Sequence, residues 1–234
     1  SLSKGRYFMF PIKKWGLDWW TKTANSIEIS QLVSNSLLIA FFVTILSTII
    51  AFCGALAFAR FSWKGKKLFQ KIILMPVFFP QPVLGLALLL WFNAIGIPLS
   101  WHTAVFAHLV WITPVVTLVI AIQVYGFDPT LEDAAKDLGA TPFQIFWRVT
   151  LPLLWPGIWS GMLFAFLLSW GNFPLSLYTT GVDNTVPKWL YSKMVAGYTP
   201  MVPTLGTMST LGAAGLMLLG ALTVYMMHRR QGRI

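Results

Sequence analysis

The chain has 234 residues, of which 56% are hydrophobic and 10% are charged, and its mean hydropathy is +0.69. Soluble globular domains carry about 25% charged residues, so this composition excludes that class and predicts an all-α integral membrane protein. The net charge of +10 comes from basic residues at the ends of apolar segments, where they set membrane topology. We therefore expect a lipid bilayer, and no nucleic acid, as a partner. Cys53 is the single cysteine, which excludes a disulfide framework.

The N-terminal segment, residues 1–30, combines tryptophans with five basic residues and contains no signal sequence. Indole rings prefer the membrane interface, so we expect an external interfacial segment, with a flexible tail as the alternative. Because the chain begins with Ser1 and an external basic segment needs a means of crossing the membrane, we also expect a first transmembrane helix to precede this sequence. The residues concerned are Trp15, Trp19, Trp20, Lys4, Arg6, Lys13, Lys14 and Lys22.

Five apolar segments are each long enough to supply the roughly 20 residues that cross a bilayer. Basic residues follow the first and the last of them, which places both sites, and the C-terminus, in the cytoplasm. Residues 128–152 are then cytoplasmic and residues 180–203 external. The predicted spans are 33–61, 68–97, 101–125, 153–178 and 204–228, and the basic residues are Arg60, Lys64, Lys66, Lys67, Lys71, Arg229, Arg230 and Arg233.

Proline and glycine interrupt the second and fourth of these predicted spans. Backbone groups freed by a broken helix need partners on the side of a cavity, and transporters often place binding sites at such breaks. The interrupting residues are Pro76, Pro80, Pro82, Gly85, Gly171 and Pro174. Candidate pathway residues are Gln81, Trp170, Asn172, Phe173 and Tyr178. Helix or lipid packing of the aromatic rings and interhelical hydrogen bonding of the amides are the alternative interpretations.

A polar stretch, residues 128–152, separates two apolar segments and holds four of the seven acidic residues. Asp128 and Pro129 are typical of a helix start, and Gly139 is typical of a left-handed helix end. Thr141 and Pro142 favour the start of a second helix. We predict a stiff helix–turn–helix lying against the membrane, able to pass force to the spans on either side.

This stretch resembles the EAA loop in permease subunits of bacterial ATP-binding-cassette importers. The family pattern is Glu-Ala-Ala, three residues, Gly, nine residues, then Ile-x-Leu-Pro, and the spacing here fits throughout. Asp133-Ala134-Ala135 replaces the usual Glu with Asp, although Glu132 stands beside it, and Val149-Thr150-Leu151-Pro152 replaces Ile with Val. The run from Leu131 to Ala140 is also similar to that of the spermidine/putrescine importers.

The resemblance implies a type I importer permease fold for residues 31–234, in the inner membrane. It implies a second permease subunit, most simply in a heterodimer, two cytoplasmic ATP-binding subunits, and an extracytoplasmic binding protein delivering a solute above a short gate helix in 180–203. ATP and Mg would be held by the partner ATPases, because Gly65-Lys66-Lys67 lacks the rest of a phosphate-binding loop; this chain is expected to have no cofactor and no enzymatic activity of its own. The implied coupling residues are Glu132, Asp133, Ala134, Ala135, Gly139, Leu151 and Pro152.

The resemblance implies a small organic solute of polyamine type, yet none of the seven acidic residues lies inside a predicted span. Gln81 and Asn172 stand where polyamine permeases often carry carboxylates, and amides suit a neutral or zwitterionic solute. The same importer class with a neutral, zwitterionic or anionic solute, amino-acid-like or opine-like, is therefore an alternative. An ATP-independent channel or secondary transporter is a further one, although it would need intramembrane ionisable groups. His102 and His108 are six apart, off a shared helical face, so no metal pair is expected.

Overall fold

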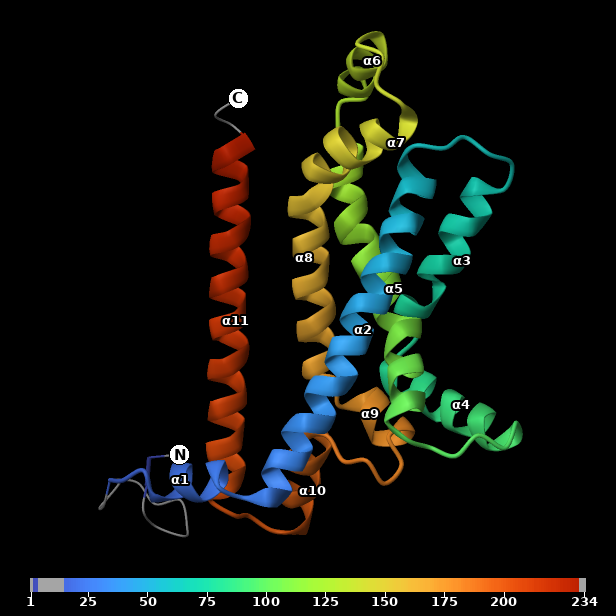
Figure 1. The fold of residues 1–234 in the computed structure, drawn as a ribbon. Helices are drawn as coiled ribbons and strands as arrows, with labels where there is room; N and C mark the ends of the chain where they lie inside the picture. The colour runs from blue at the N-terminus through green and yellow to red at the C-terminus, as the bar shows by residue number, and fades with distance from the viewer. Residues whose placement is uncertain (1, 4–14, 232–234) are drawn as a thin grey trace. The chain divides into compact units, whose positions relative to one another are not determined.

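The computed structural model describes residues 2–3 and 15–231, so Lys4, Arg6, Lys13, Lys14 and Arg233 lie outside the described residues. Within that part of the chain the regular structure is helical, and a single antiparallel bridge joins Ser3 and Trp15. The predicted all-α class is confirmed. The elements are α1 (Asp18–Ala24), α2 (Ile27–Ala59), α3 (Lys66–Phe78), α4 (Gln81–Ala94), α5 (Trp101–Tyr125), α6 (Thr130–Asp137), α7 (Pro142–Ile145), the π-helix η1 (Phe146–Thr150), α8 (Leu151–Trp170), α9 (Pro174–Thr179), α10 (Val186–Ala196) and α11 (Met201–Gln231) (Figure 1).

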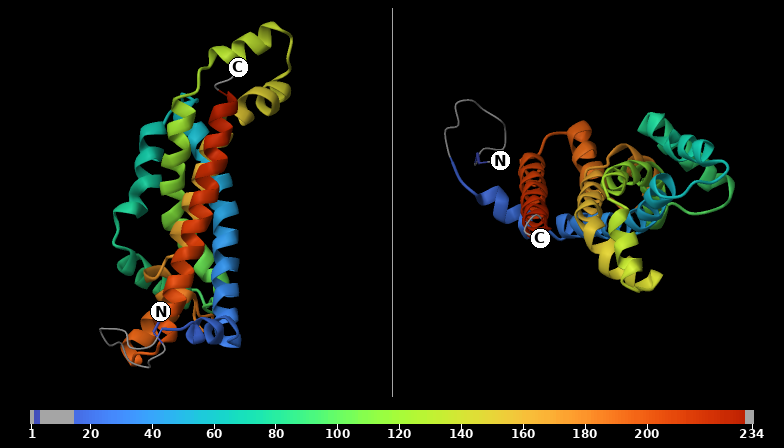
Figure 2. Two further views of the ribbon diagram at one scale, coloured as in Figure 1. Left: turned by 90° about the vertical axis from the view of Figure 1, so that its left-hand side faces the viewer. Right: turned by 90° about the horizontal axis from the view of Figure 1, so that it is seen from above.

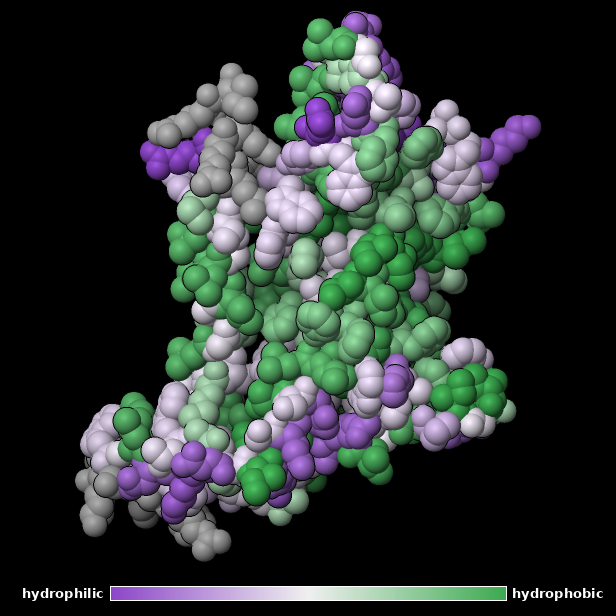
Figure 3. Space-filling view, viewed as in Figure 1, coloured by the Kyte–Doolittle hydropathy of each residue, from purple (hydrophilic) through white to green (hydrophobic). Residues whose placement is uncertain are grey.

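Four helical stretches of the described chain are long and apolar enough to cross a membrane. They are Ile27–Ala59, Trp101–Tyr125, Pro142–Trp170 and Met201–Met226. The bent pair formed by α3 and α4 would make a fifth span if it crosses as one unit, which matches the five predicted spans. In the space-filling view hydrophobic residues cover the visible sides of these helices, whereas hydrophilic residues gather on α6 and around α1 and α10 (Figure 3).

Both predicted interruptions are confirmed. The helix α3 ends at Phe78, and α4 begins at Gln81 directly after Pro80, whose ring fixes φ at −56°. The helix α8 ends at Trp170, and α9 begins at Pro174, which lacks the N–H that a first helical turn leaves unpaired. Each predicted span is therefore two helices, and the break leaves short non-helical backbone between them.

The boundary predicted at the end of the polar stretch differs from the structure. We expected a second hairpin helix that stops before a new span at residue 153, but α7, η1 and α8 follow one another without a gap. Pro152 cannot donate the hydrogen bond of a regular helix and its ring crowds the preceding turn. A π-helix, with its wider turn, accommodates this just before Leu151. A second boundary also differs: the helix of the first predicted span, α2, begins at Ile27 instead of residue 33.

The chain divides into two compact units, each built from three segments. Unit 1 comprises Ser1–Val43, Pro80–His108 and Leu167–Met217, and unit 2 comprises Thr44–Phe79, Leu109–Phe166 and Leu218–Ile234. In unit 1, α4 packs along α9, and a hydrophobic cluster forms around Trp189 with Ile29, Leu32, Val186 and Leu205. In unit 2, α6 lies beyond the end of α5, and the chain then turns back into α7 (Figure 2).

Candidate functional site

The first hairpin helix, α6, is fixed at both ends by the residues expected to do so. Asp128 Oδ1 accepts a hydrogen bond from the Thr130 N–H at 2.9 Å, and this bond holds the pKa of the Asp128 carboxyl below its usual value. At the other end Gly139 has φ of +80°. The Gly139 N–H donates to the Lys136 carbonyl at 2.8 Å and the Ala140 N–H to the Ala135 carbonyl at 3.0 Å. These two bonds form a Schellman motif, which confirms the predicted left-handed helix end.

The second hairpin helix begins with a capping box. The Gln144 N–H donates to Thr141 Oγ1 at 3.4 Å, and the Thr141 N–H donates to Gln144 Oε1 at 2.9 Å. Pro142 occupies the first helical turn, where no N–H is needed. Local sequence thus specifies the whole turn between α6 and α7, because the free backbone groups at both helix ends find partners. The stiffness of the hairpin stays a prediction.

The hairpin exposes large apolar side chains, both on α6, which lies outside the candidate spans, and on α7 and η1, which form the start of the candidate span Pro142–Trp170. Leu138 is 89% exposed and Phe143 is 72% exposed, and Trp147 on η1 and Leu131 on α6 are each about half exposed. Ile145, in contrast, is buried and anchors α7 by packing in the interior of the subunit. Polar and charged residues surround these apolar groups on α6. An exposed apolar surface with a polar rim is typical of a protein-binding site.

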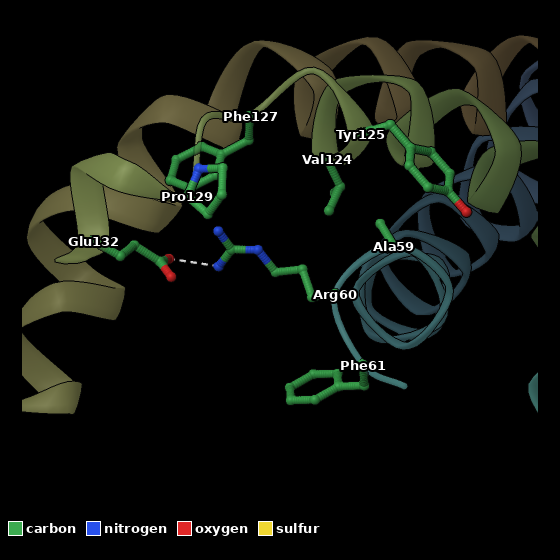
Figure 4. Close-up of a pocket in the computed structure, with 8 residues that line it drawn as sticks. All are labelled: Ala59, Arg60, Phe61, Val124, Tyr125, Phe127, Pro129 and Glu132. Atoms are coloured by element: carbon green, nitrogen blue, oxygen red, sulfur yellow. Dashed lines mark hydrogen bonds and ion pairs between the residues drawn. The ribbon is translucent and has the colours of Figure 1, made fainter. Parts of the chain in front are cut away.

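The two adjacent acidic residues of α6 have different surroundings. Asp133 is mostly exposed and pairs with Lys136 one turn on, at 2.7 Å. Glu132 is turned toward Arg60, and its Oε1 accepts from Arg60 Nη1 at 2.5 Å (Figure 4). The same oxygen accepts from the Thr150 hydroxyl. Partial burial by itself would raise the pKa of Glu132, but the hydrogen bonds from Arg60 and Thr150 and the positive charge of Arg60 outweigh it and hold this pKa below its usual value. Of these two acids, Asp133 is therefore the one exposed at the hairpin surface.

The implied coupling residues all belong to unit 2. Glu132, Asp133, Ala134 and Ala135 lie on α6 and Gly139 ends it, whereas Leu151 and Pro152 form the first turn of α8. The Ala134 and Gly139 positions are exposed, and a Cβ on Gly139 would meet nothing within 4 Å. Their role in coupling stays a prediction.

The five candidate pathway residues all belong to unit 1. Asn172 lies in the break between α8 and α9 and is only 4% exposed. Its Oδ1 accepts from the Leu175 N–H at 3.1 Å, which caps α9. Gln81 opens α4, and one turn later Gly85 packs against Tyr178 on α9. A Cβ on Gly85 would lie 2.9 Å from Tyr178 Cδ2, so only glycine permits this approach of the two half-helices.

The two other candidates are partly buried aromatic residues with partners inside unit 1. Trp170 donates its Nε1–H to Ser209 on α11 at 2.9 Å. Phe173 lies in the break and contacts the Tyr191 ring of α10, with 4.6 Å between ring centroids. The structure thus gathers all five around the junction of broken helices, while their contact with a solute stays a prediction.

Sequence reasoning missed a buried polar connection at this junction. His108 on α5 is fully buried, with Nδ1 hydrogen-bonded to Ser169 Oγ at 2.9 Å and Nε2 to Ser176 Oγ at 3.1 Å. The Ser176 hydroxyl donates its one proton to the Asn172 carbonyl at 2.6 Å, so it must accept from Nε2–H. His108 therefore joins α5 to both sides of the break. The serines at the break were the available signal, but nothing local pairs them with a histidine more than sixty residues away.

The segment after α9, which the sequence predicts to be external, is held by three long-range bonds to α2 and α5. Trp189 Nε1–H donates to Glu28 at 2.6 Å, the Val186 N–H donates to Ser36 Oγ at 2.9 Å, and Asp183 accepts from the Trp101 N–H at 2.9 Å. Lys188 is half-buried here, and this burial lowers its pKa although Asp183 opposes the shift. Within the described residues no three metal-binding side chains come together.

Comparison with known proteins identifies the family. Residues 49–233 match the family described as "Binding-protein-dependent transport system inner membrane component". The spermidine/putrescine permease PotC of Haemophilus influenzae is 31% identical over 95% of this chain and 86% of its own. The putrescine permease PotI of Escherichia coli is 31% identical over 93% of this chain and 79% of its own, and the molybdenum permease ModB of H. influenzae is 30% identical over 71% and 80%.

Solved structures support the same fold. A chain of the MetNI methionine transporter aligns with a TM-score of 0.68 over 86% of this chain and 99% of its own, at 17% identity. A chain of a bacterial alginate importer aligns with a TM-score of 0.69 over 94% and 86%, at 16% identity. The fold is that of a type I importer permease. The chain belongs to the binding-protein-dependent transport permeases, as a multi-pass inner-membrane subunit of an ATP-driven ABC importer.

Proposed function

We propose that this chain forms one half of a heterodimeric translocation pathway and that its hairpin, α6–α7, docks on a cytoplasmic ATPase. Two such ATPases, holding ATP and Mg, would drive the pathway, and an extracytoplasmic binding protein would deliver the solute. The observation that carries the coupling role is the capped hairpin, which exposes the apolar residues Leu131 and Leu138 on and directly after α6, outside the candidate spans. The hairpin and the C-terminus are cytoplasmic in this proposal, as the positive-inside rule requires.

The solute proposed is of the polyamine class, because the relatives of highest coverage here are named for spermidine and putrescine transport. Unit 1 contains three acidic residues, Asp18, Glu28 and Asp183. Glu28 and Asp183 already accept hydrogen bonds from Trp189 and Trp101. The partner permease would therefore supply the carboxylates that bind an ammonium group. Alternatively, aromatic faces would bind the ammonium group through cation–π contact.

A second candidate is a solute without positive charge, carried by the same importer. Gln81 and Asn172 are amides at the two breaks, and one relative at 30% identity is named for molybdenum transport. Amides and helix ends can bind neutral, zwitterionic or anionic groups. This candidate keeps the fold and the coupling mechanism and changes only the solute.

The test is the ATPase activity of the assembled importer with its binding protein, reconstituted in lipid. Putrescine and spermidine are titrated first, followed by zwitterionic amino acids, neutral sugars and molybdate. Stimulation by the two polyamines supports the first proposal, and stimulation only by one of the other solutes replaces it with the second. Gly139→Asp places a charge on the exposed turn, and we expect it to abolish uptake while the subunit remains inserted; normal uptake at normal expression would remove Gly139 from the coupling role.

A further inference from the structure

The cytoplasmic end of α2 is tied to the hairpin by one carboxylate. Glu132 on α6 accepts hydrogen bonds from Arg60, directly after the end of α2, and from Thr150, at the end of η1. These residues are 72 and 18 positions away from Glu132 along the chain. A single oxygen atom, Oε1, thus connects the end of α2, α6 and the end of η1 directly before α8. Figure 4 shows the bond between Arg60 and Glu132.

Further contacts support the arginine in this position. The Arg60 guanidinium carbon lies 4.4 Å from the centre of the Phe127 ring, a cation–π contact with the segment that leads into α6. Tyr125, the last residue of α5, donates its hydroxyl to the Phe58 carbonyl of α2 at 3.2 Å. Arg60 is thereby oriented from two sides toward Glu132. Thr150 is buried, so its hydroxyl depends on the carboxylate for a partner.

We propose that Arg60 and Thr150 are positioning residues for coupling, which hold the hairpin in register with α2 and α8 through Glu132. This inference rests on the proposed docking of the hairpin on an ATPase. Without the connection, a push on α6 would tilt the hairpin about the short non-helical segment at 126–129 instead of moving the spans. The exposed Asp133, whose ion pair among the described residues is with Lys136 on its own helix, does not provide such a link.

The expected size of the effect follows from the surroundings of the pair. The side chains of Arg60 and Glu132 are 20% and 18% exposed, and they border an open cavity of about 430 Å³. Water in that cavity screens the pair, so removing it costs less than removing a dry ion pair. We expect an effect of about tenfold on hairpin opening, in the range of charged hydrogen bonds at partly buried sites.

The experiment compares variants in the assembled importer by two measurements. Hydrogen exchange of the α6 amides reports hairpin opening and needs no knowledge of the solute, whereas the ratio of solute imported to ATP hydrolysed reports coupling. The variants are Arg60→Ala, Arg60→Lys, Thr150→Val, Glu132→Gln, the double variant Arg60→Ala with Glu132→Gln, and the charge exchange Arg60→Glu with Glu132→Arg. Lys64→Ala is the matched control, because Lys64 is a basic residue of the same loop with no ion pair or hydrogen bond to a described residue.

We expect Arg60→Ala and Glu132→Gln to raise α6 exchange about tenfold and to lower the transport ratio, with basal ATP hydrolysis retained in Arg60→Ala. For Arg60→Lys we expect values of α6 exchange and of the transport ratio between those of these two variants and those of the unchanged chain. The charge exchange should restore both values. The double variant should be no worse than Glu132→Gln alone, because the only described partner that Arg60→Ala removes from Glu132 is already weakened in that variant. Unchanged exchange in Arg60→Ala, or additive losses in the double variant, would overturn the proposal.

The outcome for the solute is separate from the outcome for this connection. If no solute stimulates the unchanged importer, the proposed function fails, and the exchange data still decide whether Arg60 holds the hairpin. If the importer responds to a solute and the transport ratio of Arg60→Ala equals that of Lys64→Ala, the positioning role fails while the proposed function stands. A purely structural role predicts loss of assembled complex, and it predicts no fall in transport per ATP in the complex that remains.

Discussion

Replacement of Gly139 tests whether the left-handed turn of the hairpin is needed for coupling. Its φ of +80° lies where an L-residue pays about 1–2 kcal/mol relative to glycine. A new Cβ would contact nothing within 4 Å, so no steric cost is added inside the subunit. The whole penalty therefore falls on the Schellman motif that joins α6 to α7, and the spans are left intact.

A penalty of this size raises the population of open hairpin about 5- to 30-fold. Hairpin opening should increase from the unchanged chain to Gly139→Asn, then to Gly139→Ala, and should be greatest in Gly139→Val. Asparagine tolerates left-handed backbone, whereas β-branched residues do not. Hydrogen exchange of the α6 amides in the assembled importer measures this opening, and solute uptake should fall in the same order.

Gly126→Ala provides the control for this series. Gly126 precedes the same hairpin, has no positive φ, and would place its Cβ at an ordinary 3.6 Å from the Ile122 carbonyl oxygen. We expect exchange and uptake to be unchanged. Equal exchange in Gly139→Ala and the unchanged chain, or an equal rise in Gly126→Ala, would refute the reasoning from backbone strain.

Three further predictions concern other contacts. Gly85→Ala should destabilise the importer by about 1–3 kcal/mol in thermal unfolding, because the Cβ would lie 2.9 Å from Tyr178, whereas Gly171→Ala, 3.5 Å from its nearest neighbour, should not. His108→Ala should cost about 2–4 kcal/mol in the same assay by removing two buried hydrogen bonds, with the exposed His102→Ala as control; equal effects would contradict the role of His108. The folded-state pKa of Glu132 is lowered, so its contribution is complete above the unfolded pKa of about 4.3 and is lost as pH falls through the lower folded value. Hairpin exchange corrected for intrinsic rates should then stay constant from pH 8 to about 5.5 and rise only in stronger acid, and a rise near pH 6 would oppose this assignment.

The elements foreseen from sequence depend on local chemistry. Gly139, Thr141 and Pro142 act on backbone groups within a few residues, so their roles can be read without knowing the fold. The same holds for Pro80 and Pro174, which begin new helices whatever surrounds them. The continuity of η1 with α8 was missed because a π-helix has no sequence signature as plain as a cap.

The features that sequence could not supply depend on contacts across long separations. The sequence placed Glu132 and Asp133 side by side without distinguishing them, and only the position of Arg60, 72 residues away, shows that Glu132 faces inward. His108 was discounted as half of a metal pair, whereas its partners are two serines beside the break. Asn172 was expected to face a solute, and its side-chain oxygen is used to cap α9.

The two candidate sites lie in different structural units, and this predicts how their variants should differ. Gln81 and Tyr178 belong to unit 1, whereas Arg60, Glu132 and Gly139 belong to unit 2. Loss of a solute contact weakens binding of the solute, so variants of Gln81 should raise the solute concentration needed for half-maximal uptake. Loosening of the hairpin leaves the solute site intact, so variants of Arg60 should lower maximal uptake per ATP at an unchanged half-maximal concentration. A variant of the hairpin that shifted solute preference would show that the two units cannot be assigned separate roles.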